Sequence, residues 1–306
     1  MLTIAVNFRN VAPITPSCIQ SVIGAVAQFG QPKDFEFLFI DDASDAGREV
    51  APLLVEARSR VQSRMRIIQF RTHQHYTRGC AYSFSLAQGD LLFVSHDMIL
   101  TADCIERMRQ VAAADPAHGL VRACSNYVDC FPHHVVTPPQ MPRNIADVRA
   151  FSHLVSEQMG ATFTEDPFLV GDVMLIRREV LDRVGAMDHR YYGYFGDVDY
   201  GLRVQHAGYR LVCAKGAWLF HEGAGFYLNE ARVRQVDYDV IHRERMRIVN
   251  DAYQLFRQKW NPALPAEYPG SMDGLDIPGL RSLSPLPFPV HQPPPAPLTP
   301  TIGRFL

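Results

Sequence analysis

The first 125 residues alternate short apolar runs with longer amphipathic segments. The apolar runs predict strands at residues 2–6, 35–40, 65–70, 91–94 and 120–124, and the segments between them predict helices at 16–29, 46–61, 77–87 and 101–114. Nearly continuous apolar strands separated by helices indicate a parallel sheet covered by helices on both faces. The sequence therefore predicts an α/β fold with a Rossmann-like, mostly parallel sheet.

Polar side chains follow three of these predicted strands. They are Asn7 and Arg9, then Asp41, Asp42 and Ser44, and then Ser95, His96 and Asp97. Ligands of parallel sheets bind at the carboxyl ends of the strands, near the point where the strand order reverses, so we expect a binding site there. The alternative is that Asp42 or Ser44 only caps the next helix. Two adjacent carboxylates exceed what a cap requires.

The pattern is weaker in the second half of the chain. Between 126 and 165 it is broken by Pro132, Pro138, Pro139 and Pro142, which predicts a polar loop region. Regular structure is then expected again, with a strand at 168–177, helices at 179–184 and 199–207, strands within 210–220 and a long amphipathic helix within 229–259. Residues 261–306 are rich in proline, which predicts an extended or disordered tail whose role the sequence leaves open.

Ionisable residues also stand at two boundaries of this second half. The glycine-bearing segment 193–196 precedes Asp197 and Asp199 at the start of a predicted helix. Asp199 can pair with Arg203 one turn later, whereas Asp197 is freer to point into a cleft as a base or, alternatively, to cap the helix. The apolar run 218–220 ends in His221. A histidine and an aspartate from different strand ends can share a Mg²⁺ or Mn²⁺ ion with a diphosphate.

Composition narrows the possible partners. The 306 residues carry a formal net charge of −2, which gives no reason to expect a nucleic-acid partner. Six cysteines without a CxxC pair are interpreted as buried free thiols, and His73, His75, His133 and His134 as surface or loop histidines. The chain opens on a predicted strand rather than a signal peptide, and it has no apolar run of about 18 residues. We therefore expect a cytoplasmic protein, with peripheral membrane contact as an open option and the oligomeric state undetermined.

The order and spacing of several motifs resemble glycosyltransferase family 2, over roughly residues 2–226. The motifs are FIDDASD at 39–45, RGCAYSFSLAQGDLLFVSHDM at 78–98, LIRREVLDRVGAMD at 175–188, GDVDYGLRVQHAGYRL at 196–211 and WLFHEG at 218–223. The resemblance implies a GT-A fold and an inverting transferase that uses a nucleoside-diphosphate sugar, most readily a UDP-sugar. The domains expected are a nucleotide-binding half at 1–125, an acceptor and catalytic half at 126–226, a packing helix at 227–260 and the tail at 261–306.

The resemblance also implies roles for individual residues. Asp97 matches the last aspartate of the DxD motif and, with His221, is expected to bind Mn²⁺ or Mg²⁺. Asp197 matches the general base that deprotonates the acceptor hydroxyl. Gly171 and Asp172 are expected near the transferred sugar. Nucleotide contacts are expected from Asn7, Arg9, Asp41, Asp42, Arg78 and His96.

Two departures from the family pattern leave alternatives open. Ser95 and His96 replace the residues more usual in the DxD motif, so His96 is either a further metal ligand or a phosphate contact. Gly196 replaces the usual glutamate before the base, so Asp199 remains an alternative to Asp197. Both departures also suit a degenerate module that binds nucleotide sugars or glycans without turnover. The acceptor, whether a glycan, a lipid-linked sugar, a protein or a small molecule, is not determined by the sequence.

Overall fold

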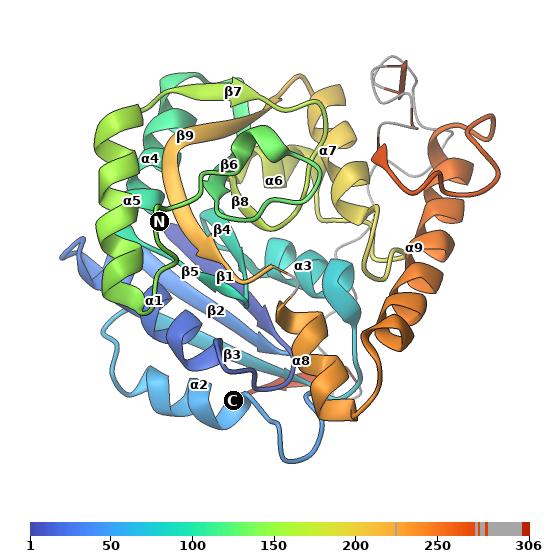
Figure 1. Cartoon of the computed structure of the whole chain (residues 1–306). Helices are drawn as coiled ribbons and strands as arrows, with labels where there is room; N and C mark the ends of the chain where they lie inside the picture. Colours follow the sequence, from blue (N-terminus) through green and yellow to red (C-terminus); the bar gives the residue numbers. More distant parts are fainter. Residues whose placement is uncertain (224, 273–274, 276–278, 281–301) are drawn as a thin grey trace.

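The computed structural model describes residues 1–223, 225–272, 275, 279–280 and 302–306. Its centre is a ten-stranded mixed sheet in the order β10-β3-β2-β1-β4-β8-β6-β9-β5, with β7 paired to β9 (Figure 1). The strands are β1 (Leu2–Phe8), β2 (Phe35–Asp41), β3 (Arg64–Phe70), β4 (Asp90–Ser95), β5 (Met98–Ile99), β6 (His118–Ser125), β7 (Phe163–Glu165), β8 (Val173–Ile176), β9 (Arg210–His221) and β10 (Gly303–Phe305).

Helices cover both faces of this sheet. They are α1 (Thr15–Ala27), α2 (Ala51–Arg58), α3 (His75–Leu86), α4 (Ala102–Ala114), α5 (Ile145–Met159), α6 (Arg178–Val184), α7 (Gly196–His206), α8 (Gly225–Arg234) and α9 (Tyr238–Trp260). Apolar residues of α1, α2 and α4 bury one face of the strands, and those of α3, α6 and α7 bury the other. This two-layer burial explains why the central strands are nearly continuous apolar runs, and it confirms the predicted α/β fold.

The sheet topology creates one switch point. The strands β3, β2, β1 and β4 run parallel, and β1 lies between β2 and β4, so the chain winds in opposite directions from β1. At the carboxyl ends, Asn7 of β1 pairs with Ser95 of β4, and Phe8 pairs with Asp41 of β2. The three polar strand ends are therefore adjacent in space, as the sequence predicts.

Several predicted elements differ from the structure. The predicted helix at 46–61 is only Ala51–Arg58, and the predicted strand at 168–177 is only Val173–Ile176. The segment 126–165 is not all loop, because it contains α5 and β7. Helix α5 was hidden by the prolines before it, but Asn144 caps it by accepting a hydrogen bond from the Asp147 backbone N–H at 2.9 Å.

The C-terminal part also departs from expectation. The long helix predicted within 229–259 is two helices, separated at Gln235, whose φ of 53° interrupts the helical geometry. Residues 303–305 form an antiparallel strand on the free edge of β3, so the end of the proline-rich tail is ordered. Most of the tail lies outside the described residues. Among the described helices, none combines the length and the apolar character that crossing a bilayer requires.

Candidate active site

Asp97 and His221 meet at the edge of the sheet. The two-residue strand β5 pairs with the end of β9, with Met98 opposite His221, and this register brings the preceding Asp97 beside the imidazole. Asp97 Oδ2 lies 3.3 Å from His221 Nε2, and both side chains are about nine-tenths buried. The predicted pair of cation ligands is therefore close enough to share one ion.

The second ring nitrogen of His221 is also held. Nδ1 lies 2.9 Å from the backbone carbonyl of Tyr127, and a carbonyl only accepts, so Nδ1 carries a proton. Burial lowers the pKa of His221, but the hydrogen bond and the charge of Asp97 outweigh it and raise that pKa to about 9. Burial raises the pKa of Asp97, and the hydrogen bond from His221 more than offsets this, so that the net pKa is lowered. The two side chains thus form an ion pair with a proton between Nε2 and Oδ2, and a cation bound by both would take the place of that proton.

Asp197 stands in the first turn of α7, after Phe195, which has a left-handed φ of 61°. Its Oδ2 accepts a hydrogen bond from the Gly171 backbone N–H at 3.0 Å. Burial among neighbouring side chains raises the pKa of Asp197 to about 6, although backbone hydrogen bonds lower it. Its side chain remains partly exposed. This carboxylate is ionised at neutral pH and keeps some contact with solvent.

Asp199 differs from Asp197 although it lies only two residues away. It is fully buried, and its oxygens accept from Arg203 Nε at 3.1 Å and from Trp260 Nε1 at 2.9 Å. Lys259 is also paired with it. Helix α9 supplies Lys259 and Trp260, so Asp199 joins α7 to α9 rather than facing the cleft.

The loop before β8 connects these two parts of the site. Gly171 donates to Asp197, as described above, and its carbonyl accepts from the Tyr76 hydroxyl. The carbonyl of Asp172 accepts from the Ser95 backbone N–H at 3.0 Å. Gly171 has no space for a side chain, because a Cβ there would lie 2.4 Å from Tyr76 Oη. The base candidate and the DxD-like segment are therefore fixed to one another through two consecutive residues.

The carboxylate of Asp172 is engaged inside the protein. It accepts from the guanidinium of Arg122 at 2.7 Å and from the Val173 backbone N–H at 2.9 Å. Arg122 is fully buried in β6. This residue was missed from the sequence, although a charged side chain within an apolar strand is a signal that could have identified it. Tyr76 and Tyr127 were likewise missed, because the Tyr76 hydroxyl reaches the backbone of Gly171 and the Tyr127 backbone carbonyl reaches the side chain of His221, both far away in the sequence.

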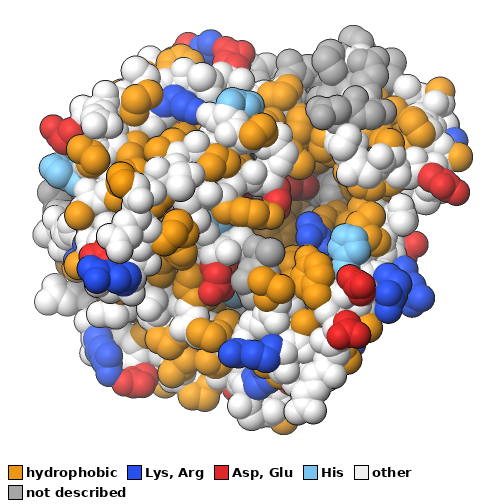
Figure 2. Space-filling view, in the orientation of Figure 1, with side chains coloured by type: hydrophobic (Ala, Val, Ile, Leu, Met, Phe, Trp, Pro, Cys, Tyr) orange, Lys and Arg blue, Asp and Glu red, His pale blue; other side chains and the backbone are white. Residues whose placement is uncertain are grey.

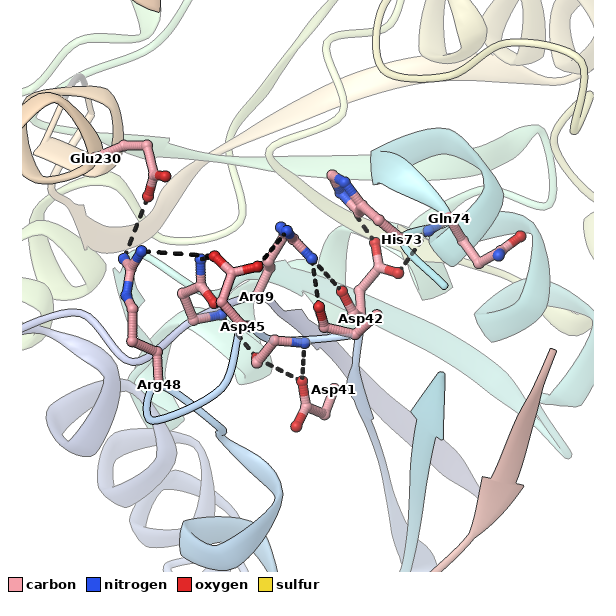
Figure 3. Close-up of polar contacts among 11 residues, drawn as sticks. Arg9, Asp41, Asp42, Asp45, Arg48, His73, Gln74 and Glu230 are labelled. Atoms are coloured by element: carbon pink, nitrogen blue, oxygen red, sulfur yellow. Dashed lines mark hydrogen bonds and ion pairs between the residues drawn. The ribbon is translucent and has the colours of Figure 1, made fainter. Parts of the chain in front are cut away.

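Among the nucleotide-binding candidates drawn in Figure 3, Asp41 and Arg9 form hydrogen bonds within the loop that follows β2. Asp41 accepts at Oδ1 from the Ser44 backbone N–H at 3.1 Å and at Oδ2 from the Ala51 N–H at 3.0 Å, so it closes the loop and caps the first residue of α2. Arg9 donates to the Asp42 carbonyl at 3.0 Å and to the Asp45 carboxylate at 3.0 Å. The hydrogen bonds of Asp41 and Arg9 therefore hold the loop together. Their role in nucleotide binding stays a prediction.

Asp42 presents its carboxyl group beside this loop. Oδ1 accepts from the Gln74 backbone N–H at 2.7 Å, and Oδ2 lies 3.4 Å from His73 Nε2 (Figure 3). Burial raises the pKa of Asp42 to about 7, against the lowering effect of the Gln74 N–H and of Arg9. The His75 backbone N–H also bonds to this carboxylate, and the His73 imidazole lies beside Oδ2 at a marginal distance for an ion pair.

The remaining candidates lie around the same strand ends. Asn7 Oδ1 accepts from Ser83 at 3.1 Å, while its buried Nδ2 has no hydrogen-bond partner among the described residues. Arg78 donates to the His189 carbonyl at 2.7 Å, and its guanidinium lies 4.4 Å from the centre of the Tyr192 ring. Burial lowers the pKa of His96, which keeps the imidazole neutral beside Asp97. Figure 2 shows a hollow on this face, with acidic, basic and histidine side chains at its edge.

One histidine expected at the surface is buried. His134 is fully buried, and its Nε2 lies 2.6 Å from Asp166 Oδ1. His133 is exposed, as predicted, and five of the six cysteines are buried, Cys130 being the exception. The sequence could not distinguish the two adjacent histidines. They lie in a single turn of 3₁₀ helix at Pro132–His134, which exposes the side chain of His133 and buries that of His134.

The fold of the chain was compared with known protein structures. Two solved structures resemble the chain in fold. The mannosyltransferase PcManGT from Pyrobaculum calidifontis, in complex with GDP-Man and Mn²⁺, is 16% identical with a TM-score of 0.51 over 75% of this chain and 60% of its own. GalNAc-T7, with UDP, GalNAc and Mn²⁺, is 11% identical with a TM-score of 0.54 over 72% of this chain and 43% of its own. The chain thus spans well under two thirds of these structures.

A search of curated protein sequences finds no match. The family model of glycosyl transferase family 2, in contrast, matches residues 3–185, which is more than half of the 306-residue chain. The matched range includes the DxD-like segment, the 168–172 loop and the carboxyl ends of β1, β2 and β4. The chain therefore belongs to glycosyl transferase family 2.

Proposed function

We propose that the protein is an inverting glycosyltransferase that moves a sugar from a nucleoside-diphosphate sugar to an acceptor hydroxyl with the help of Mn²⁺ or Mg²⁺. The observation that carries this proposal is the connection of three groups. Asp97 and His221 lie 3.3 Å apart, and Ser95, two residues before Asp97, is hydrogen-bonded to the loop that holds Asp197. This connection supports the proposal that cation ligands and a base act on either side of one short segment.

The Asp97–His221 pair fits a divalent cation. The Nδ1–H of His221 is bound to the Tyr127 carbonyl, which leaves Nε2 directed at Asp97, and a metal-binding histidine is commonly oriented by such a contact. Two protein ligands suit Mg²⁺ or Mn²⁺, which retain waters and substrate phosphates as further ligands. When bound, the cation would supply charge neutralisation for the departing diphosphate. His96, neutral and adjacent, is available either to the cation or to a phosphate.

Asp197 is proposed to act as the general base. With a pKa of about 6 it is ionised at neutral pH and basic enough to receive the proton of the attacking hydroxyl. The Gly171 N–H holds one carboxylate oxygen and so orients the group. A single displacement needs no covalent enzyme intermediate and inverts the anomeric centre. The burial and triple pairing of Asp199 favour Asp197 over it.

Asp42 is proposed to bind the nucleobase, and a UDP-sugar is the proposed donor. Oδ1 of Asp42 accepts from the Gln74 N–H, and Oδ2 lies 3.4 Å from His73 Nε2, so we infer that this crowded carboxylate receives one further N–H donor from the base. Uracil offers one imide N–H, whereas the matching edge of guanine offers two neighbouring donors. The fold is shared with proteins solved with GDP-Man and with UDP, so the base must be decided by experiment.

A second candidate is a module that binds the donor without turnover. It is favoured by Gly196, where the family usually has glutamate. A Cβ at Gly196 would lie 2.4 Å from Thr77 Cγ2, so the packing of α7 on α3 excludes any side chain there. The absence of the glutamate is thus part of how this chain packs. It leaves Asp197 as the carboxylate available for proton transfer.

Turnover assays separate the two candidates. The protein is incubated with UDP-, GDP- and dTDP-sugars, Mn²⁺ or Mg²⁺, and a panel of glycan, lipid-linked, protein and small-molecule acceptors. Nucleoside diphosphate release measures turnover, and NMR of the product gives its anomeric configuration. Asp197→Asn should bind UDP as the wild type does and lose about 10²–10⁴-fold in transfer rate. The control is Asp34→Asn, an exposed carboxylate before β2.

The outcomes are distinct. Inverted product with loss of activity in Asp197→Asn supports the proposal. Binding of a nucleotide sugar without any turnover supports the non-catalytic module. Product with retained configuration, or full activity of Asp197→Asn, excludes the mechanism proposed here.

A further inference from the structure

A second cluster of metal-binding side chains lies inside the molecule, between β6, β9 and the loop that follows β6. It consists of Cys124, Cys213 and His134, whose ligand atoms all lie within 4.8 Å of one another, and all three residues are buried. We refer to these three residues as the thiol–imidazole cluster. The proposed catalytic pair, Asp97 and His221, shares no residue with it.

The separation of the two sulfurs distinguishes between possible roles. Cys124 Sγ and Cys213 Sγ lie 3.7 Å apart. A disulfide requires about 2.05 Å, so the sulfurs would have to approach by more than an ångström and a half. Two thiolates at the usual Zn–S distance of about 2.3 Å in a tetrahedral site lie about 3.8 Å apart. The observed spacing fits an edge of a zinc tetrahedron.

Asp166 orients the imidazole of the cluster. His134 Nε2 lies 2.6 Å from Asp166 Oδ1, so Nε2 carries the proton and Nδ1 keeps its lone pair. A carboxylate bound to the far nitrogen of a histidine is the usual outer-sphere arrangement at zinc sites. Asp166 itself is fully buried and lies 3.5 Å from the Arg122 guanidinium. The histidine is thereby held in the tautomer that a metal needs.

The ammonium group of Lys215 lies beside the thiol–imidazole cluster. Lys215 Nζ lies 3.1 Å from His134 Nδ1 and donates to the His133 carbonyl at 2.9 Å. The Cys213 thiol and the Lys215 ammonium both hydrogen-bond to Cys124 and lower the pKa of that thiol, whereas the hydrogen bond with Cys124 and burial raise the pKa of Cys213. Lys215 is partly exposed, unlike the cluster, so its flexible side chain can turn outward to solvent. The ammonium thus marks a position where positive charge is stabilised.

We propose that Cys124, Cys213 and His134 bind a zinc ion, and that Lys215 competes for the same position. The chemistry favours Zn²⁺ over Mg²⁺ or Mn²⁺, because thiolate and imidazole are its preferred ligands. Two thiolates neutralise the ion, and Arg122 is balanced by Asp166 and Asp172, so no uncompensated positive charge is buried. A water or an additional side chain would complete the tetrahedron.

The zinc would join β6 to β9 and to the segment after β6. That segment contains Asn126 and Tyr127, which hold the backbone N–H and the Nδ1 of His221. A bound zinc ion would therefore fix the frame on which His221 is mounted. This role is structural and does not depend on the reaction proposed above.

The test measures metal binding by the full chain. The protein is purified under reducing conditions, its zinc content is determined by mass spectrometry, and the metal-free form is titrated with Zn²⁺ alone and with Co²⁺ alone. We expect one equivalent of zinc, and a Co²⁺ spectrum with a thiolate-to-metal charge-transfer band. Cys124→Ala and Cys213→Ala should lose both, whereas the control Cys104→Ala, another buried free thiol, should retain them.

Two further variants distinguish loss of the zinc site from misfolding and from metal binding at Asp97 and His221. Lys215→Ala leaves every ligand in place and should raise zinc affinity by about tenfold or more, since the competing ammonium is gone. Asp97→Asn should leave the zinc content unchanged. No bound zinc and no charge-transfer band in the wild-type protein, or loss of zinc in Asp97→Asn with normal binding in Cys124→Ala, would overturn the proposal.

Discussion

Replacement of Asp197 by asparagine should stabilise the protein while abolishing transfer. The carboxylate of Asp197 is held in an environment that raises its pKa from 3.8 to about 6. Asparagine keeps an oxygen that can accept the Gly171 N–H, and it removes the buried charge. The variant therefore isolates the cost of keeping a base ionised at this position.

The magnitude follows from the pKa shift. A raised carboxyl pKa destabilises the folded state at every pH above the unfolded pKa, because the charged form is less favourable when folded. The cost is nearly absent at pH 4 and reaches its limit above pH 6, where a shift from 3.8 to about 6 corresponds to about 3 kcal/mol. The side chain is partly exposed, so solvent screening makes this an upper value. Relative to the asparagine variant, wild-type stability should fall as pH rises from 4 to 7.

Urea unfolding at pH 4, 6 and 8 measures this difference directly. The gain in unfolding free energy of Asp197→Asn should be under about 1 kcal/mol at pH 4 and about 2–3 kcal/mol at pH 8. The rate of the chemical step in the wild type should decrease below pH 6, as the base becomes protonated.

Asp199→Asn is the matched control on the same helical turn. It weakens contacts with Arg203, Lys259 and Trp260, so it should destabilise the fold at pH 8 by about 1–3 kcal/mol. If Asp197→Asn gave the same change in stability at pH 4 and pH 8, the carboxylate would not be perturbed as described, and the argument for its selection as base would fail.

Three further predictions test other parts of the structure. Gly196→Ala should destabilise the fold by about 1–3 kcal/mol through the clash with Thr77, whereas Gly193→Ala, which has room for a Cβ, should not; equal melting temperatures would contradict this. UDP affinity should weaken as pH falls below about 7, where Asp42 protonates, and Asp42→Asn should remove that dependence in calorimetry. Lys259→Met should cost about 3–5 kcal/mol in urea unfolding, because Asp188 and Asp199 lose a shared buried cation, whereas the exposed Lys33→Met should have no effect.

The sequence alone predicted the sheet, which the structure confirms, and a candidate site at the carboxyl ends of its strands. Short, nearly continuous apolar runs between helical segments are typical of strands buried on both faces, and the structure has those strands at β1, β2, β3, β4 and β6. The residue types at their carboxyl ends also identified Asp42 and Asp97 before any coordinates. Local patterns succeed here because consecutive residues in the sequence are enough to indicate both that a strand is buried and where it reaches the surface.

Only the tertiary structure decided which of these residues meet. Asp97 and His221 are 124 positions apart in the chain, and they are brought together by the register of β5 on β9. Asp197 and Asp199 have the same residue type in the same helical turn, and α9 separates their roles by covering one of them with Trp260 and Lys259. His133 and His134 are separated in the same way by the burial of one ring. A local pattern gives the exposure of a residue along its own element, whereas its partners are set by packing between elements distant in the chain.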